Sequence, residues 1–471
     1  MNHEEFRKNA HAAVDWVADY LQQIEKYPVK SQVAPKDIYD QIPPSPPGSG
    51  EPFEALMSDL DSIIMPGITH WQHPHFHAYF PGNSSYPSVI AEILTAGIGA
   101  QCMVWETSPA AAELEERMME WFKEMMGLPT DWHGVIQDTA STATLTALLT
   151  AREWKTDFQS NTKGVTERKL RIYCSTETHS SAEKAVKIAG LGSENLVKIP
   201  VDGEMSMVPA ALQKAIEADM AMGYTPCMVI SAMGTTGTLA FDPTKQIGEI
   251  CRQYNIWFHV DAAYAGSALV LPELEWLREG LELADSFVFN PHKWLFTNFD
   301  CSAYFVKDKE ALIKTFEILP EYLKTKTRGQ VNDYRDWGIQ LGRRFRALKL
   351  WFVIRTYGVD HLRSTIRTHI GYGAWLANQI EKDSHFELLT PQKLNMVVFR
   401  YSASDKSTEE LNTINESILT QINQSGKAYI THTKVNGMYG IRVVLGQTRL
   451  EKNHVKNLWG LLVKTSDESS H

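Results

Sequence analysis

The stretch SFVFNPHKWLF covers residues 286–296 and joins an apolar, strand-like run to a turn at Asn290-Pro291. Lys293 follows the turn and precedes a second apolar run, so we expect its amine to be partly withdrawn from water. Desolvation lowers the pKa of a lysine, and the neutral amine is the form that attacks a carbonyl carbon. A lysine that reaches out of a strand end into solvent is the competing interpretation, and the segment fits both.

Short apolar runs of this kind alternate with helical stretches from residue 134 to about residue 310. Strands of continuous apolarity that are separated by helices are typical of a mostly parallel sheet covered on both faces. The pattern therefore predicts an α/β fold. The expected strands are GVIQD (134–138), LRIYC (170–174), CMVIS (227–231), IWFHVD (256–261), SFVFN (286–290) and CSAYFV (301–306).

The N-terminal part of the chain predicts a helix followed by an extended arm. Apolar residues spaced from Phe6 to Ile24 form a stripe that an isolated helix could not leave in water. Prolines and glycines are concentrated in the stretch 28–52, which should be extended. Such a helix could reach a partner subunit or pack back on its own chain, and both arrangements stay open.

Two further helices and a C-terminal domain complete the expected organisation. Ser108 as the N-cap and Gly127 as the stop should bound one helix, and a long helix is expected over 342–357. The sequence thus predicts an N-terminal arm, a large α/β domain and a small α+β domain. Their expected ranges are 1–85, 86–360 and 361–471, the last with strands at MVVFRY (396–401), AYITHT (428–433) and YGIRVVL (439–445).

The composition narrows the class of protein. The 46 basic and 56 acidic residues give a formal net charge of -10 without a dense basic block, so nucleic acid is not an expected partner. Five widely spaced cysteines and an N-terminus without a secretory signal predict a cytoplasmic location. The stretch 88–105 is nearly apolar, but Pro87, Glu92 and Gln101 favour a helix in the core or a subunit interface over a membrane span.

A carboxylate ends another expected strand, in IWFHVDAAYAG (256–266). Asp261 should lie at the carboxyl edge of a parallel sheet, where a buried carboxylate is costly unless it meets a cation. Lys293 follows after about one strand–helix–strand step, so both residues can flank one pocket. An Asp that caps the next helix is the alternative for Asp261 taken alone.

The stretch GVIQDTASTATLTALLTAR (134–152) predicts a strand, a turn at Thr139, Ala140 and Ser141, and then a helix. Backbone N–H groups and hydroxyls at a helix N-terminus bind phosphate, although simple capping also explains each residue singly. An imine-forming lysine, a carboxylate suited to a pyridinium nitrogen and a phosphate turn thus occur in α/β order. Together they predict a site for pyridoxal 5′-phosphate (PLP), which acts as an electron sink while its ring nitrogen is protonated.

Several strings of the sequence carry a resemblance to a known family. They are HWQHPHFHAYFPGNSSYPS (70–88), SPAAAELE (108–115), THSSAEKA (178–185), FHVDAAYAGSA (258–268), ADSFVFNPHKWLFTNFDCSA (284–303) and LGRRFRALKLWFV (341–353). The sequence resembles the group II PLP-dependent decarboxylases, most closely the aromatic-L-amino-acid decarboxylases. The resemblance implies the aspartate aminotransferase-like α/β fold of fold-type I, PLP as the cofactor, and a homodimer with the active site at its interface.

The resemblance also implies roles for single residues. Lys293 holds PLP in a Schiff-base linkage, Asp261 pairs with the pyridine nitrogen, and His179 stacks on the cofactor ring. Tyr322 falls on the mobile catalytic loop of the family, in a polar segment that reads as an exposed lid. The other positions implied to contact the cofactor are Thr139, Ala140, Ser141, Thr236, Ala263, His292 and Asn290.

The implied reaction is loss of the carboxylate as CO2, followed by return of a proton to Cα from the loop tyrosine. Relatives with Phe at that tyrosine, or another residue at the histidine, make aldehydes by oxidative deamination. Because Tyr322 and His179 are both present, formation of the amine is favoured. The alternatives are a decarboxylase of histidine or glutamate, an aromatic aldehyde synthase, and a catalytically silent dimer that uses the fold for interaction.

The string HWQHPHFH (70–77) carries four histidines, which by spacing alone could bind a metal. Interleaved aromatic residues favour the wall of a substrate pocket, as the resemblance implies, and no metal is expected. A glycine at position 342 leaves room for a bulky ring, which favours indolic or catecholic substrates. The positions expected to contact the substrate are Trp71, Tyr79, Phe80, Pro81, Gly82, Gln101, Met103 and Gly342.

Overall fold

The computed structural model describes residues 1–165, 169–318 and 330–469. Within these ranges the chain divides into two compact units, each with its own sheet. Met1–Pro81 together with Gly371–His471 form the terminal unit, and Gly82–Ile370 form the central unit. The expected division into an arm, a large domain and a small domain stays a prediction.

The central unit is built on a mostly parallel sheet. Its strands are β1 (His133–Gln137), β2 (Leu170–Ser175), β3 (Leu196–Ile199), β4 (Thr225–Ala232), β5 (Trp257–Asp261), β6 (Ser286–Phe289) and β7 (Ser302–Val306). In the described part of the chain they lie in the order β1-β7-β6-β5-β4-β2-β3. β7 is antiparallel to β1 and β6, while the other neighbours are parallel. The predicted α/β fold is confirmed.

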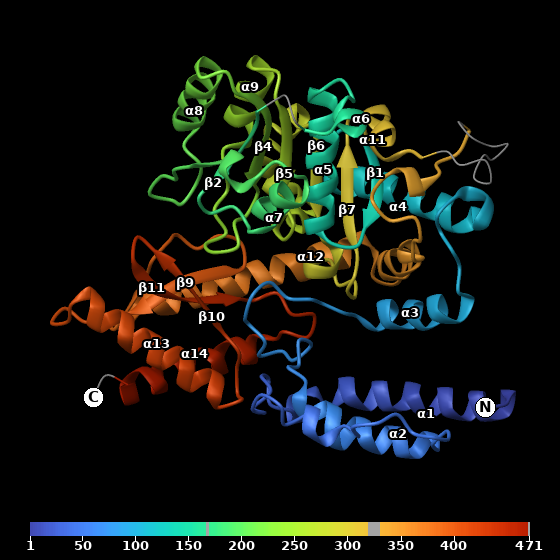
Figure 1. The fold of residues 1–471 in the computed structure, drawn as a ribbon. Helices are drawn as coiled ribbons and strands as arrows, with labels where there is room; N and C mark the ends of the chain where they lie inside the picture. The colour runs from blue at the N-terminus through green and yellow to red at the C-terminus, as the bar shows by residue number, and fades with distance from the viewer. Residues whose placement is uncertain (166–168, 319–329, 470–471) are drawn as a thin grey trace. The chain divides into compact units, whose positions relative to one another are not determined.

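Helices cover both faces of this sheet (Figure 1). α5 (Ala140–Lys155) packs across β1 and β4 to β7, and α9 (Thr244–Gln253) packs on β4 and β5. Trp257 belongs to the core beneath α5, whereas Phe258 lies beside Gly248 of α9. Because successive strand residues point to opposite faces, α5 and α9 lie on opposite sides of the sheet. Further helices are α3 (Tyr86–Ile98), α4 (Pro109–Met126), α6 (Ser160–Lys163), α7 (Ser181–Ile188), α8 (Pro209–Ala221), α10 (Pro291–Trp294) and α11 (Lys309–Phe316).

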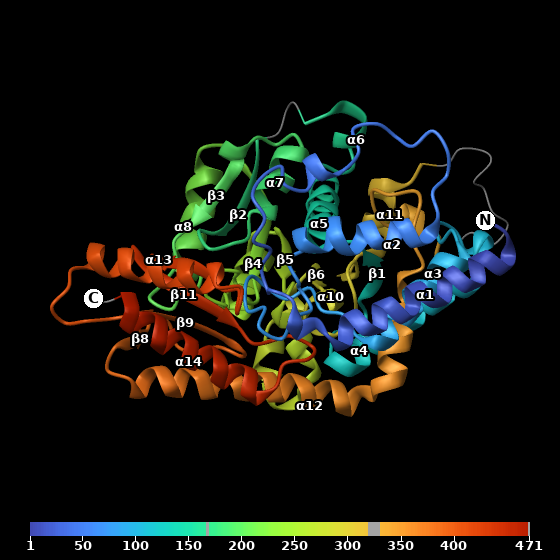
Figure 2. The same cartoon turned by 90° about the horizontal axis from the view of Figure 1, so that it is seen from below.

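The terminal unit holds an antiparallel sheet in the order β10-β11-β9-β8. The strands are β8 (Phe386–Leu388), β9 (Met396–Tyr401), β10 (Thr431–Val435) and β11 (Met438–Val444). α13 (Thr408–Gln424) and α14 (Lys452–Ser469) pack on one another and share an apolar core with this sheet (Figure 2). α1 (His3–Gln22) and α2 (Phe53–Asp59) flank the proline-rich stretch, which consists largely of turns and irregular backbone.

The long helix expected over 342–357 is wrong at its start. α12 (Arg346–Lys382) begins four residues later than expected and is interrupted at Gly358, where φ is 70°. The backbone N–H of Arg343 donates to Gln101, and the Arg343 side chain pairs with buried Glu115. These long-range bonds hold the chain before α12 out of a helix. The short strands β3 and β8 were also not expected from the sequence.

The boundaries of two other helices depend on glycine. α4 ends before Gly127 and α3 ends before Gly99, and both glycines are left-handed, with φ of 64° and 62°. Ser108 is the N-cap of α4, as predicted, although its side chain makes no capping hydrogen bond. Over the described ranges, no helix combines the length and the apolar character needed to cross a membrane.

Candidate active site

The segments that follow the parallel strands carry the residues expected to bind the cofactor. β1 leads to Thr139, β2 to His179, β4 to Thr236 and β6 to Lys293, and β5 ends on Asp261. Since these strands run in the same direction, their carboxyl ends lie at one edge of the sheet (Figure 1). The fold therefore brings these segments to the same side of the central unit.

Lys293 lies in α10, a single helical turn directly after β6. Its N–H donates to the carbonyl of Asn290 at 2.9 Å, and its carbonyl accepts from Nδ2 of Asn83 at 2.6 Å. Trp294 and Leu295 are fully buried, whereas Lys293 is half-buried. The lysine backbone is thus fixed on both sides, with the side chain at the boundary between the core and solvent.

Asp261 is the last residue of β5 and pairs with Ala232 of β4 and Val288 of β6. Its Oδ1 accepts the N–H of Ala263 at 3.0 Å. The part of the chain that the structure describes supplies no hydrogen-bond donor to the other oxygen, Oδ2. Local capping therefore accounts for one oxygen of this half-buried carboxylate and leaves the second as an acceptor for a ligand.

His179 lies between β2 and α7, where it interacts electrostatically with both Asp261 and Lys293. Burial lowers the pKa of the imidazole, Asp261 opposes this effect, and Lys293 adds to it. Nδ1 accepts the N–H of Ser181 at 3.1 Å, so the neutral ring carries its proton on Nε2. The charges of Asp261 and Lys293 thus both act on His179, whose ring is hydrogen-bonded to Ser181.

Thr139 is the N-cap of α5, and its Oγ1 accepts the N–H of Thr142 at 3.4 Å. The N–H groups of Ala140 and Ser141 open the first turn, where a helix offers no internal acceptor, and they have none among the described residues. Asp138 accepts the N–H of Thr139 at 2.6 Å, which places a carboxylate at the border of the turn. The two open N–H groups at the positive end of α5 form an anion-binding arrangement.

Asn290 and His292 are buried on either side of Pro291 and tie the lysine turn to β7. The hydroxyl of Ser302 donates to Oδ1 of Asn290 at 2.6 Å, and Nδ1 of His292 accepts the N–H of Cys301 at 2.9 Å. Burial and the neighbouring lysine lower the pKa of His292 to about 3, so its ring is neutral at ordinary pH. Their expected contact with the cofactor stays a prediction.

Thr236 and Ala263 lie in the loops after β4 and β5. Asp242 closes the loop of Thr236 by accepting the N–H of Ala232 at 2.7 Å. The carbonyl of Ala263 accepts the N–H of Asn290 at 3.0 Å, which joins its loop to the lysine turn. Both loops are therefore held to the same sheet edge as Lys293.

The aromatic residues expected to contact the substrate gather in the terminal unit. Trp71 stacks on Tyr79 with ring centroids 5.8 Å apart and lies 4.4 Å from Phe76. The hydroxyls of Tyr79 and Tyr429 are 3.1 Å apart. Trp71 and Tyr79 are 40% and 48% exposed, whereas Phe80 is buried. We call Trp71, Tyr79 and Phe80 the aromatic wall. Two of its three rings, those of Trp71 and Tyr79, are partly exposed.

The other expected substrate residues are divided between the two units. Pro81 ends the first segment of the terminal unit, and the central unit contains Gly82, Gln101, Met103 and Gly342. Oε1 of Gln101 accepts the N–H of Arg343 at 2.8 Å. A Cβ built on Gly342 would lie 3.4 Å from Nε2 of Gln101, so these two positions are in contact.

Three polar residues that support the site were not predicted. Asn83, Ser181 and Ser302 bind the Lys293 carbonyl, the His179 ring and the Asn290 side chain, respectively. Ser181, two residues from His179, could have been found from its position in the THSS string. Asn83 is 210 positions from Lys293, whereas Ser302 is only 12 positions from Asn290, on β7. Tyr322, expected on the catalytic loop, lies outside the described residues.

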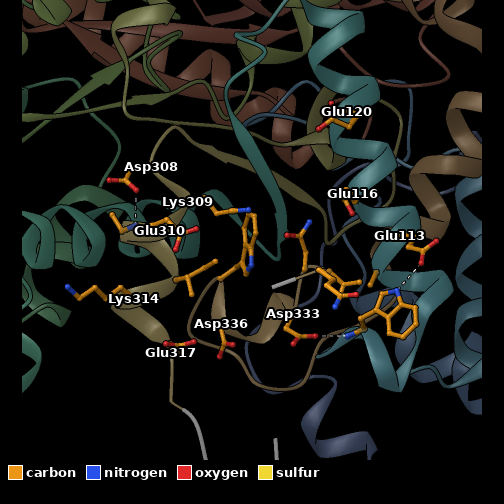
Figure 3. A pocket seen from close by; sticks show the side chains of 18 of the residues that line it. Glu113, Glu116, Glu120, Asp308, Lys309, Glu310, Lys314, Glu317, Asp333 and Asp336 are labelled. Carbon is orange, nitrogen blue, oxygen red and sulfur yellow. Dashed lines mark hydrogen bonds between the residues drawn. The ribbon is translucent and has the colours of Figure 1, made fainter. Parts of the chain in front are cut away.

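A cavity of about 1360 Å³ lies elsewhere in the central unit, beside α4 and α11 (Figure 3). Most of the lining residues that are labelled in Figure 3 carry carboxylates, among them Glu113, Glu116 and Asp336. The residues expected to bind PLP do not line it. Across the described residues, no group of three or more His, Cys, Asp or Glu side chains is arranged to hold a metal ion.

The chain is similar to known proteins over nearly its whole length. Residues 35–402 match the pyridoxal-dependent decarboxylase conserved domain. Tyrosine decarboxylase 2 of Narcissus pseudonarcissus is 41% identical over 98% of this chain and 93% of its own. Phenylacetaldehyde synthase of Arabidopsis thaliana is 40% identical over 100% and 98%. The crystal structure of Oryza sativa TDC with PLP and tryptamine has a TM-score of 0.96 at 35% identity and 99% coverage of both chains. The crystal structure of Catharanthus roseus tryptophan decarboxylase in complex with L-tryptophan has a TM-score of 0.94 at 36% identity, and the match covers 100% of this chain and 99% of that chain.

Proposed function

The chain belongs to the family of pyridoxal-dependent decarboxylases, and from this premise we propose that it decarboxylates an aromatic L-amino acid to the amine and CO2. The observation that carries the proposal is that Asp261, Lys293 and His179 lie at the carboxyl ends of parallel strands β5, β6 and β2, at one edge of the sheet. The relatives named for tyrosine and tryptophan decarboxylation support the aromatic substrate class.

The residues at this edge fit PLP. Lys293 would carry the cofactor through its amine, and Oδ2 of Asp261 would accept a hydrogen bond from the N–H of the pyridinium nitrogen, which stays protonated. The N–H groups of Ala140 and Ser141, which lack acceptors within the described residues, would bind the phosphate. When bound, PLP supplies an electron sink for the electron pair left behind by CO2.

The protein supplies orientation and proton control around this chemistry. His179 is held by Ser181 as the neutral Nε2–H tautomer, so it can pack against a ring and donate one hydrogen bond. Tyr322 would return the proton to Cα, a role carried over from the resemblance. We propose that Trp71, Tyr79 and Phe80 bind the substrate ring, and that Gly342 and Gln101 limit its size.

An aromatic aldehyde synthase is the second candidate, because phenylacetaldehyde synthases are as similar to the chain as the decarboxylases are. His179 and Tyr322 favour the decarboxylase. Assays of amine, CO2, aldehyde, peroxide and ammonia on tryptophan, tyrosine, phenylalanine, histidine and glutamate separate the candidates. Amine without peroxide from an aromatic substrate is expected; aldehyde with peroxide would support the synthase.

Replacement of Tyr322 by Phe tests the origin of the proton. We expect the Tyr322→Phe variant to keep PLP and to lose amine formation, by about a hundredfold for the loss of a general acid. With O2 as the oxidant, aldehyde, hydrogen peroxide and ammonia can form in its place. Quantifying amine and aldehyde in the same reactions gives the answer, and unchanged amine turnover would remove Tyr322 from the mechanism.

A homodimer and a cytoplasmic location are also part of the proposal. α3 exposes Tyr86, Ile90, Ile93 and Ile98, apolar residues on one side of a helix, and such a face suits contact with a second copy of the chain. The predicted stripe of α1 is likewise exposed at Phe6. The cysteines at positions 102, 174, 227, 251 and 301 are all free and buried, which suits a reducing compartment.

A further inference from the structure

Arg442 is a buried cation of the terminal unit. It sits on β11 between Ile441 and Val443, which belong to the apolar core shared with α13 and α14. Because neighbouring strand residues point to opposite faces, Arg442 lies on the face away from that core. Only 3% of the residue is exposed, so its guanidinium needs compensating contacts.

Those contacts lead to the aromatic wall. Nη1 of Arg442 donates to the carbonyl of Tyr79 at 2.6 Å and to Oγ1 of Thr431 at 3.4 Å. The guanidinium carbon lies 4.8 Å from the centre of the Phe80 ring. Thr431 is opposite Arg442 in the β10–β11 register, and its Oγ1 accepts the N–H of Tyr79 at 3.4 Å. Arg442 and Thr431 together thus bind both backbone polar groups of Tyr79.

Tyr79 needs such a hold because its φ is 50°, in the left-handed region that residues with a Cβ avoid. The chain before it is already fixed, since the N–H of His77 donates to the carbonyl of Tyr429 at 2.8 Å. The turn at Tyr79 then directs its ring onto Trp71. Loss of the Arg442 contact would release this turn while leaving the preceding backbone pairing in place.

We propose that Arg442 is a positioning residue for substrate binding: it fixes the turn at Tyr79 and the ring of Phe80, and so the shape of the aromatic wall. This inference rests on the proposed function, in which these rings contact an aromatic substrate. A planar guanidinium can donate to a carbonyl in its plane while its face covers a ring, whereas the ammonium of a lysine cannot do both.

The test compares the holoenzyme with Arg442→Lys and Thr431→Val. Arg400→Lys is the matched control, because Arg400 is a buried arginine of β9 in the same sheet that pairs with Glu387 at 2.5 Å, away from the wall. KM and kcat are measured for tryptophan, tyrosine and phenylalanine, together with PLP absorbance and Tm. For Arg442→Lys we expect KM to rise about tenfold, the usual scale for a loosened pocket contact. kcat and PLP content should change little, Thr431→Val should show a smaller rise, and Arg400→Lys none.

An unchanged KM in Arg442→Lys, or an equal rise in Arg400→Lys, would assign Arg442 to the stability of the sheet alone and overturn the inference. If Arg442→Lys does not fold, Thr431→Val decides, and a wild-type KM in that variant is the contradicting result. A wild-type enzyme that decarboxylates no aromatic amino acid rejects the proposed function and the inference with it. An active wild type with an unmoved variant KM rejects the inference only.

Discussion

At the scale of single residues, hydrogen bonds within the protein decide which polar atoms of the candidate site could bind a ligand. Asp261 gives one oxygen to the N–H of Ala263 and keeps the other open. Nδ1 of His179 accepts the N–H of Ser181, so the neutral ring carries its proton on Nε2. Each side chain therefore has its orientation set by the protein and one polar atom left for a ligand, an arrangement in which little reorganisation is needed during the reaction.

Asp261→Asn keeps the shape of the side chain and the contact with Ala263 but removes the negative charge. PLP should bind more weakly, and kcat should fall by about a hundredfold or more, because the charge that stabilises the pyridinium is lost. PLP titration followed by absorbance, combined with turnover at saturating PLP, measures both effects. Near-normal activity at saturating PLP would refute the role of Asp261.

Gly342→Ser tests the size limit on the substrate ring. A side chain there would approach Nε2 of Gln101, since a Cβ already lies 3.4 Å from it. We expect kcat/KM for tryptophan to fall about tenfold relative to phenylalanine, the scale for small changes in pocket volume. Gly460→Ser is the control, because a Cβ at Gly460 meets nothing within 4 Å. Equal ratios in all three proteins would separate Gly342 from substrate selection.

The sequence predicted the residues whose chemistry is visible in their local context, and it missed those that meet only in the folded chain. Lys293 and Asp261 stand beside apolar strands, which is unusual for charged side chains. Asn83 is a common turn residue, and its partner Lys293 is 210 positions away. No short pattern carries that pairing, so it had to come from the structure.

At the scale of elements, a buried ion pair joins α4 to the segment before α12. Oε1 of Glu115 lies 2.6 Å from Nη2 of Arg343 and accepts the N–H of Ile136 at 2.8 Å. Arg343 also donates to the carbonyl of Ile136 at 2.8 Å. The pair therefore fixes β1, α4 and the neighbourhood of Gly342 together.

Glu115→Ala would leave this guanidinium buried without its carboxylate. The free energy of unfolding should fall by about 3–5 kcal/mol, the usual cost of breaking a buried pair from one side. Urea denaturation of the PLP-bound protein measures it. Glu279→Ala, which breaks the exposed pair with Lys245, should change the midpoint little. A similar small change in Glu115→Ala would mean that water or another group satisfies Arg343.

The length of an element and its long-range contacts determined how well the sequence predicted it. β4 and β9 coincide with continuous apolar runs, and the sequence predicted their ends to within two residues. The start of α12 was misplaced because the long-range contacts of Arg343 override local helix propensity. β3 and β8 contain 4 and 3 residues, which is too short for a periodic signal.

The histidine segment gives the terminal unit a predictable dependence on pH. Burial lowers the pKa of His73 to about 3 and that of His75 to about 4, and it lowers the pKa of His77 well below 6.5. In the unfolded chain these rings bind protons near pH 6.5, while the folded chain keeps them neutral. Stability is therefore complete above pH 6.5 and is lost as pH falls from there toward the folded pKa values.

His77→Phe should reduce this loss, because it removes one ring that the unfolded state protonates. The variant gives up the contact of Nδ1 with the carbonyl of Val444, 3.3 Å away, which lowers stability at all pH values. Tm of both proteins is compared at about pH 8 and about pH 5, and the difference should shift in favour of the variant at the lower pH. A difference that does not depend on pH would contradict the account.

At the scale of the whole molecule, the exposed apolar residues of α3 predict self-association. Ile90 and Ile93 are 52% and 46% exposed. They lie on α3, a helix with few polar residues that could face water instead. Leaving such a face in water is unfavourable, and a second copy of the chain is the simplest cover. The sequence had already predicted an interface or a core helix here, and the exposure of α3 within the described chain favours the interface.

The combined variant Ile90→Asp, Ile93→Asp should shift the protein from dimer to monomer, because it places charges in a desolvated contact. Sedimentation velocity gives the mass of each form. Ile188→Asp on α7 is the control, since Ile188 is 62% exposed but belongs to a different surface. A variant that keeps the wild-type mass, or a wild type that is monomeric at all concentrations, would contradict the proposed dimer.

The central claim is that Lys293 carries PLP in a decarboxylase of aromatic amino acids. The most direct measurement is the amount of amine and of CO2 formed from tryptophan, tyrosine and phenylalanine by the PLP-loaded wild type and by Lys293→Ala. Equal amounts of amine and CO2 are expected from at least one of these substrates, and neither product is expected from Lys293→Ala. Aldehyde and peroxide in place of amine, or amine formation that survives in Lys293→Ala, would contradict it.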